Sequence, residues 1–152
     1  MIRTPMSLEG DPAPETGAPP DRPGRISGLV VARGAATGLL LAMPAAFASG
    51  VLSDRTPKPK GAINVAFLVV VLGFFLAGWL AGREAPSMPA KHGALAAFVA
   101  FLPVEVVAIL ARLDRGDSVG LGGIIFVGLL AACAGTAGAQ LGARRSSRRE
   151  KP

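Results

Sequence analysis

The chain has 152 residues, of which 51% are hydrophobic, and its mean hydropathy is +0.49. A soluble domain of this length has too small an interior to bury so much apolar sequence, so the composition excludes an ordinary soluble protein. The formal net charge is +6, with the basic residues mostly in polar segments. Because the basic C-terminal segment has no aromatic residues on which bases could stack, this charge favours contact with anionic lipid headgroups over nucleic-acid binding.

The N-terminal segment is polar and rich in proline. Residues 5–23 hold six of the 13 prolines, with four acidic residues between them. Such a segment has too little apolar surface to offset the entropy lost on ordering. We therefore expect residues 1–28 to form a disordered cytoplasmic tail.

Four apolar stretches follow, at residues 29–52, 63–81, 94–113 and 119–143. Each is close to the ~20 residues that a helix needs to cross a bilayer core of about 30 Å. The loops between them are short, and short loops make successive helices antiparallel. The sequence therefore predicts an all-α membrane protein with four transmembrane helices in an up-down-up-down bundle. Residues 144–152 are predicted to be a basic cytoplasmic tail.

The first apolar stretch leaves two outcomes open. Its Ala46-Phe47-Ala48 segment follows an apolar core and is similar to a signal-peptidase site, which would place cleavage after Ala48. However, about 30 residues precede that core, whereas signal peptides usually start nearer the N-terminus. We therefore expect an uncleaved anchor.

The distribution of Lys and Arg predicts the orientation. Eleven of these residues lie on the side of the two termini and the 82–91 loop, and five lie on the opposite side. Cytoplasmic segments carry the excess of basic residues in membrane proteins. Both termini are therefore predicted to lie in the cytoplasm.

Small residues recur at helical spacing along the spans. Because lipid tails are as apolar as leucine, helices associate in a membrane where small residues let their backbones approach closely. In the fourth span the small residues advance by about 3.5 residues on average, the period of left-handed helix packing. A homo-oligomer interface is the open alternative to packing within the bundle. The predicted packing glycines are Gly34, Gly38, Gly78, Gly82, Gly128, Gly135, Gly138 and Gly142.

Glu105 lies near the middle of the third span, two residues after Pro103 and on the same helix face as Arg112. Because Arg112 is two turns away, about 10 Å along the axis, we predict that Glu105 has no cation at its depth. An ionised carboxylate is costly there, so a protonated, inward-facing Glu105 is expected. A structural role would have it donate to a carbonyl freed by Pro103. A functional role would have it bind a proton or cation.

Three other polar residues are assigned structural roles. Arg33 lies one turn inside the first span, and its long side chain is expected to reach the headgroups. His92 is the only histidine and has no ligand cluster nearby, so it is interpreted as an interfacial polar residue and not as a metal ligand. Cys133 is the only cysteine, which rules out an intrachain disulfide, and it is predicted to be a small packing residue.

The junction between the second and third spans reads Gly-Phe-Phe-Leu-Ala-Gly-Trp-Leu-Ala-Gly-Arg at residues 73–83 and Lys-His-Gly-Ala-Leu at residues 91–95. It resembles a group of small four-helix bacterial membrane proteins of unknown function, in which a Gly-rich helix ends in an Ala-Gly-Arg-like turn and the next helix opens with His-Gly. The resemblance implies the same topology, in a bacterial plasma membrane, and no activity. This chain has Ala77-Gly78 where the group often has two glycines.

The sequence holds no paired carboxylates, nucleophile–base pair or metal-ligand cluster, so neither an enzyme nor a cofactor is expected. The first expectation is a structural or accessory membrane component. Its partners would be the lipid bilayer and a second copy of the chain or another membrane protein. The alternative is a small oligomeric ion or proton-coupled transporter that uses Glu105.

Overall fold

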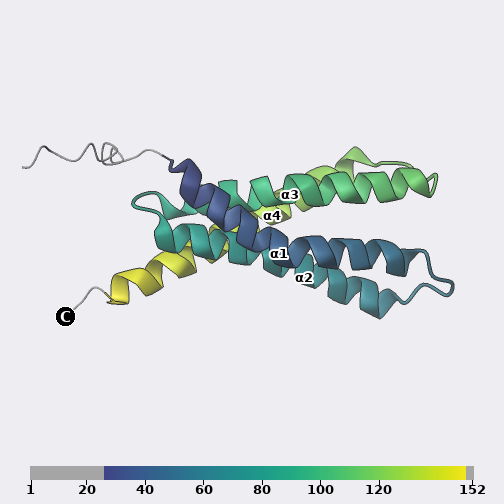
Figure 1. Cartoon of the computed structure of the whole chain (residues 1–152), viewed down its shortest axis with the longest axis horizontal. Helices are drawn as coiled ribbons and strands as arrows, with labels where there is room; N and C mark the ends of the chain where they lie inside the picture. The colour runs from purple at the N-terminus through teal and green to yellow at the C-terminus, as the bar shows by residue number, and fades with distance from the viewer. Residues whose placement is uncertain (1–25, 150–152) are drawn as a thin grey trace, which may run out of the picture.

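The computed structural model describes residues 26–149, which form four helices and no strand. All four helices are long and apolar enough to cross a bilayer. They run up, down, up and down, so the predicted fold class is confirmed (Figure 1). Apart from its last three residues, the predicted disordered tail lies outside the described residues. The helices are α1 Gly28–Ser53, α2 Lys60–Glu84, α3 Pro89–Asp114 and α4 Leu121–Arg149.

The helices extend beyond the apolar stretches that predicted them. α3 begins at Pro89, where a proline is tolerated because the first helical turn leaves its backbone N–H groups unpaired in any case. α4 continues to Arg149, through most of the predicted basic tail. Arginine is a good helix former, and its charge interacts favourably with the carbonyl end of the helix.

The bundle has two distinct ends (Figure 1). We call the end with the two chain termini and the α2–α3 loop the terminal end, and the end with the other two loops the loop end. α2 and α3 contact each other and both outer helices, whereas α1 and α4 do not touch within the described chain. At the loop end the α1–α2 hairpin diverges from the α3–α4 hairpin (Figure 1).

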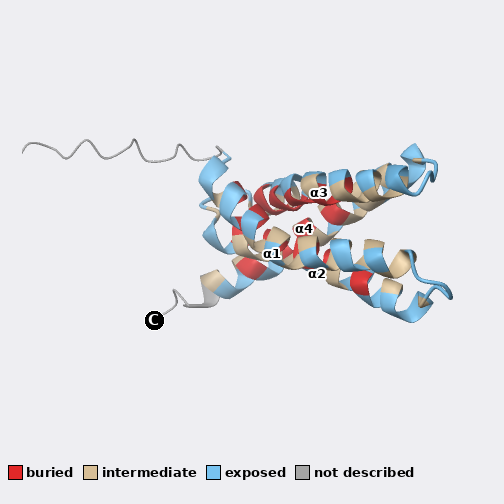
Figure 2. Cartoon of the chain, turned by 45° about the vertical axis from the view of Figure 1, so that its right-hand side comes forward, coloured by how far each residue is buried: buried red, intermediate tan, exposed pale blue. Residues whose placement is uncertain are grey.

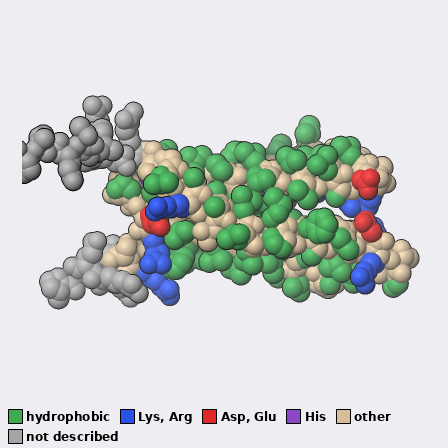
Figure 3. All heavy atoms as spheres, in the orientation of Figure 1, with side chains coloured by type: hydrophobic (Ala, Val, Ile, Leu, Met, Phe, Trp, Pro, Cys, Tyr) green, Lys and Arg blue, Asp and Glu red, His purple; other side chains and the backbone are tan. Residues whose placement is uncertain are grey.

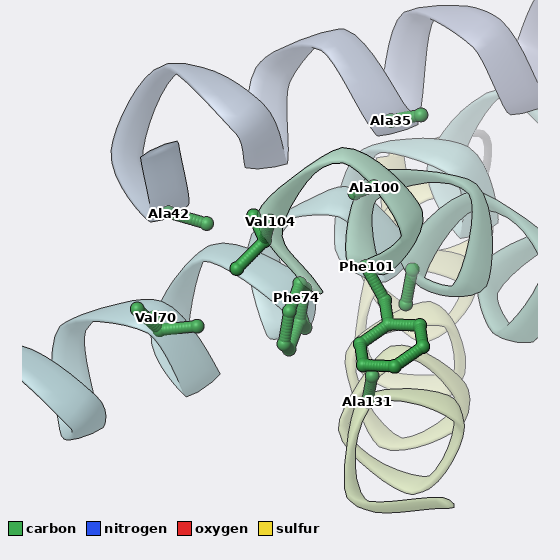
Figure 4. Close-up of a cluster of buried hydrophobic side chains, with 9 residues drawn as sticks. Ala35, Ala42, Val70, Phe74, Ala100, Phe101, Val104 and Ala131 are labelled. Atoms are coloured by element: carbon green, nitrogen blue, oxygen red, sulfur yellow. The ribbon is translucent and has the colours of Figure 1, made fainter. Parts of the chain in front are cut away.

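Burial follows this asymmetry, since buried residues gather where the hairpins cross and toward the terminal end (Figure 2). Going toward the loop end, the last buried residues are Ala42 in α1, Ala66 in α2, Glu105 in α3 and Ala131 in α4. At the centre, the rings of Phe74 and Phe101 meet edge to face, with centroids 6.3 Å apart, among small side chains (Figure 4). The terminal half is therefore sealed and the loop half is open.

Glycines explain why the helices pack so closely in the sealed half. A Cβ added to Gly34 would lie 2.6 Å from the carbonyl oxygen of Ala77, and one added to Gly78 would collide with the backbone of Gly135. Seven of the eight predicted packing glycines make such close approaches to a neighbouring helix. Gly128 differs, because a Cβ there would be in ordinary contact, 3.5 Å from the Phe101 ring.

The packing role predicted for Cys133 is wrong, because this side chain is exposed on the bundle surface. Cys133 follows Ala131 by two residues, which is about 200° around a helix. Since Ala131 is buried, Cys133 lies on the opposite, outer face of α4.

Cleavage after Ala48 would remove α1 from the bundle, where Gly34, Gly38 and Ala42 pack against α2. The uncleaved anchor stays a prediction.

Candidate functional site

A groove of about 560 Å³ lies between the diverging halves of α1 and α3. Its walls are mainly apolar, with Phe47 and Val51 from α1 and Leu110 from α3, and Arg112 lies among its polar lining residues. A second hollow of about 430 Å³, lined by Lys58 and other polar residues, shares Arg112 with the groove and lies at the loop end. Figure 3 shows the gap between the hairpins there, flanked by charged side chains.

Glu105 lies at the boundary between the sealed and open halves. It is only 7% exposed, and its Oε1 atom is buried without a hydrogen-bond partner. Arg112 Nη1 lies 3.7 Å from that oxygen, and the Arg112 side chain is 33% exposed. The carboxyl group is thus held inside the bundle, while its counter-ion lines the groove that opens at the loop end.

The prediction that Glu105 has no cation at its depth is therefore wrong. The Cα–Cβ bonds of a helix tilt toward its N-terminus, so a long side chain reaches back over the preceding turns. The Arg112 side chain spans most of the two turns that separate the backbones. The expected hydrogen bond to a carbonyl freed by Pro103 is not made by Oε1. The protonation state of Glu105 stays a prediction.

At the mouth of the groove, an ion pair joins the α1–α2 hairpin to the α3–α4 hairpin. Arg115 Nη1 lies 3.3 Å from Asp54 Oδ1, and Arg115 Nε donates to Asp117 Oδ2 at 3.0 Å. The hydrogen bond to Asp117, with the added attraction of Asp54, raises the pKa of Arg115, so this residue stays positively charged. Asp54 follows α1 and Arg115 follows α3, so this contact crosses between the hairpins. Exposed ion pairs stabilise little, so the contact opposes movement of the hairpins only weakly.

His92 lies in the first turn of α3 and is fully buried among the helices. Its place at the membrane interface stays a prediction. Its Nε2 accepts the backbone N–H of Ser27 at 2.9 Å, and its Nδ1 lies 3.2 Å from the carbonyl oxygen of Met88. These partners fit a neutral ring with its proton on Nδ1. His92 thus fastens the start of α1 to α3 at the terminal end. Its spacing from the buried Ala96 and Ala100, four and eight residues on, was a signal that sequence reasoning missed.

Arg33 is the remaining charged residue that was predicted inside a span. Arg33 has a side chain 62% exposed and lies 3.7 Å from Glu84 at the terminal end, in keeping with a boundary residue. Among residues 26–149, no group of three or more His, Cys, Asp or Glu side chains could hold a metal ion.

The chain matches no protein-family model, and no curated protein or solved structure is significantly similar to it. The resemblance of residues 73–83 and 91–95 to small four-helix bacterial membrane proteins therefore stays a prediction. The functional proposal rests on the geometry of this chain.

Proposed function

We propose that this chain is a non-enzymatic membrane protein that binds a proton or small cation at Glu105, as part of a small ion or proton-coupled transporter. The observation that carries the proposal is the buried Oε1 atom of Glu105, which has no hydrogen-bond partner. Glu105 itself does not line the groove, but Val107 and Ala108, two and three residues on, and its counter-ion Arg112 do. Buried polar atoms nearly always have a hydrogen-bond partner, so one that has only a distant ion pair calls for a ligand or a functional role. Ionisable residues inside membranes commonly mark proton or ion pathways.

The Glu105–Arg112 pair supplies an exchange mechanism. When Glu105 is ionised, the positive charge of Arg112 balances it at 3.7 Å. When a proton or cation binds Glu105, Arg112 loses that attraction and can turn toward the groove, which its side chain already lines. Release of the proton or cation into the groove restores the pair. Binding and release are thereby coupled to the position of one arginine.

The open loop half and sealed terminal half correspond, in this proposal, to one of two states. α1 contains Pro44 and α3 contains Pro103, both near the level where the hairpins diverge. Proline removes a backbone hydrogen bond and bends a helix, which makes each position a hinge. Rocking of the hairpins about these hinges would open the terminal half and carry Glu105 to the other side. With the orientation given by the basic residues, the loop end faces away from the cytoplasm.

The second candidate is a structural or accessory membrane component. The direct backbone contacts of α2 and α4 favour it, since Gly78 meets Gly135 and Gly82 meets Ala139 with no space between the helices. In that case Glu105 and Arg112 would only stabilise α3, and the groove would serve as a surface for another membrane protein or a second copy of the chain.

Proton flux separates the two candidates. The full chain is reconstituted in vesicles that contain a pH-sensitive dye, and a pH gradient is imposed in the presence of candidate cations. The transporter proposal expects flux above that of empty vesicles and a loss of about tenfold or more in Glu105→Gln, which keeps the shape of the carboxyl group. Asp54→Asn is the matched control, because it removes an exposed carboxylate at the mouth of the groove. Flux no greater than that of empty vesicles would rule out the transport role and leave the accessory one. Flux that is above this level but equal in the wild type and Glu105→Gln would rule out the role of Glu105.

A further inference from the structure

A separate groove, of about 290 Å³, lies between α2 and α4 toward the terminal end and shares no lining residue with the groove between α1 and α3. It is lined by Phe75, Leu76 and Trp79 from α2 and by Leu141 and Arg145 from α4. Three of these side chains are purely apolar, one is the only tryptophan of the chain, and one is basic.

The groove exists because two glycines bring the helix backbones together. A Cβ on Gly138 would collide with the carbonyl oxygen of Phe75, and one on Gly142 would collide with that of Trp79. The backbones thus form the floor of the groove, and the larger side chains of each helix form its walls. Both helices run from the loop end to the terminal end, so Phe75 and Leu141 lie deeper in the membrane than Arg145.

Basic side chains gather at the shallow end of this groove. The Arg83 guanidinium carbon lies 4.8 Å from the centroid of the Trp79 ring, which places its charge over the wall of the groove. Arg145 lines the groove from α4, while Arg83 does not line it and is placed beside it by its contact with Trp79. The described helices carry seven basic residues at the terminal end and one acidic residue, Glu84, which lies beside Arg33 at 3.7 Å. The groove therefore presents unbalanced positive charge at the depth of lipid headgroups.

We propose that this groove binds one anionic phospholipid from the leaflet at the terminal end. Its phosphate would lie between Arg83 and Arg145, because guanidinium groups bind phosphate oxygens through paired hydrogen bonds. Trp79 would lie at the interface between headgroup and acyl chains, where tryptophan is enriched in membrane proteins. An acyl chain would follow Phe75 and Leu141. A free phosphate ion would leave this apolar part of the groove unused, so the ligand is a lipid.

Trp79 provides the test, since its fluorescence is the only tryptophan signal of the chain. The full chain is reconstituted in phosphatidylcholine vesicles that contain increasing fractions of phosphatidylglycerol brominated on its acyl chains. Parallel vesicles contain brominated phosphatidylcholine. Bromine quenches tryptophan on contact, so quenching measures how often each lipid occupies the groove. We expect the anionic lipid to be preferred at least threefold.

Two variants localise the effect. Arg145→Gln, which leaves the Arg83–Trp79 contact in place, should reduce the preference, and Arg83→Gln together with Arg145→Gln should abolish it. Lys58→Gln together with Lys60→Gln removes the same charge at the loop end and should leave the preference unchanged. Equal quenching by the two lipids in the wild type would overturn the site. A preference that survives the double arginine variant would also overturn the site, because these arginines would then not bind the lipid. If both double variants lower the preference equally, the attraction comes from the net charge of the chain and the site is again overturned.

Discussion

Arg112 and Glu105 form an ion pair within a single helix, with Nη1 and Oε1 3.7 Å apart across two turns of α3. The pair therefore does not tie one helix to another. Arg115 and Asp54 do join the two hairpins, but they lie at the exposed mouth of the groove. The charge inside the bundle can thus change without breaking a contact between hairpins, and the hairpins can move without breaking the pair.

Removing Arg112 should cost more stability than neutralising Glu105. Arg112→Gln leaves a buried carboxyl group without its counter-ion and should lower the free energy of unfolding by roughly 1–3 kcal/mol. Glu105→Gln should cost less, because Arg112 is partly exposed and can turn into the groove. The double variant should recover part of the Arg112→Gln loss. Denaturant unfolding in micelles measures the free energy of unfolding of the wild type, the two single variants and the double variant. If the effects of the two substitutions are additive, the two residues are not coupled.

The glycine contacts should determine the stability of the sealed half. In Gly135→Ala the new methyl group would collide with Ala97 Cβ and lie 2.5 Å from the carbonyl oxygen of Gly93. Such overpacking should lower the free energy of unfolding by about 1–3 kcal/mol. Gly128→Ala is the matched control on the same helix, since its methyl group would be in ordinary contact with Phe101. Equal thermal stability of the two variants in detergent would contradict the packing account.

His92 should stabilise the first turn of α1. His92→Ala removes the acceptor of the Ser27 N–H, which is one hydrogen bond worth about 1 kcal/mol. Amide exchange at the start of α1 should then accelerate about three- to tenfold, while exchange at the centre of α2 stays unchanged. Lys91→Ala, next to it and exposed, should leave both rates as they are. Unaltered exchange in His92→Ala would show that this hydrogen bond does not hold the helix end.

The orientation of the chain is also open to measurement. The excess of basic residues at the terminal end predicts cytoplasmic termini. A reporter that is active only outside the cytoplasm should be inactive when fused after residue 152 and active when inserted in the loop between α1 and α2. The reverse pattern would place the groove of Glu105 on the cytoplasmic side.

The sequence predicted the four spans because each was a long apolar stretch bounded by charge or proline. The helix ends were predicted less accurately, because hydropathy marks the part of a helix that lies inside the membrane and not the part that extends beyond it. α4 shows this, since its last turns are basic and still helical through Arg149.

The candidate site was predicted only in part. Glu105 was identified because a carboxyl group within an apolar span is costly. Its partner was missed because the separation from Arg112 was measured between backbones, without the reach of the side chain. The groove could not be predicted at all, since it depends on where two hairpins diverge. Along the groove, α1 has no buried residue beyond Ala42 and α3 has none beyond Glu105, and only the packing of the helices reveals this.

The central claim is that the groove connects Glu105 with the aqueous phase at the loop end, and cysteine accessibility tests it most directly. Cys133→Ala provides a cysteine-free background, and since Cys133 is exposed this change should alter stability by less than about 0.5 kcal/mol. Ala108→Cys, one turn from Glu105 on the groove wall, should react with a membrane-impermeant thiol reagent added at the loop end. Ala100→Cys, in the sealed half, should stay unreacted until the protein is unfolded. Protection of Ala108→Cys in the folded protein would contradict the account.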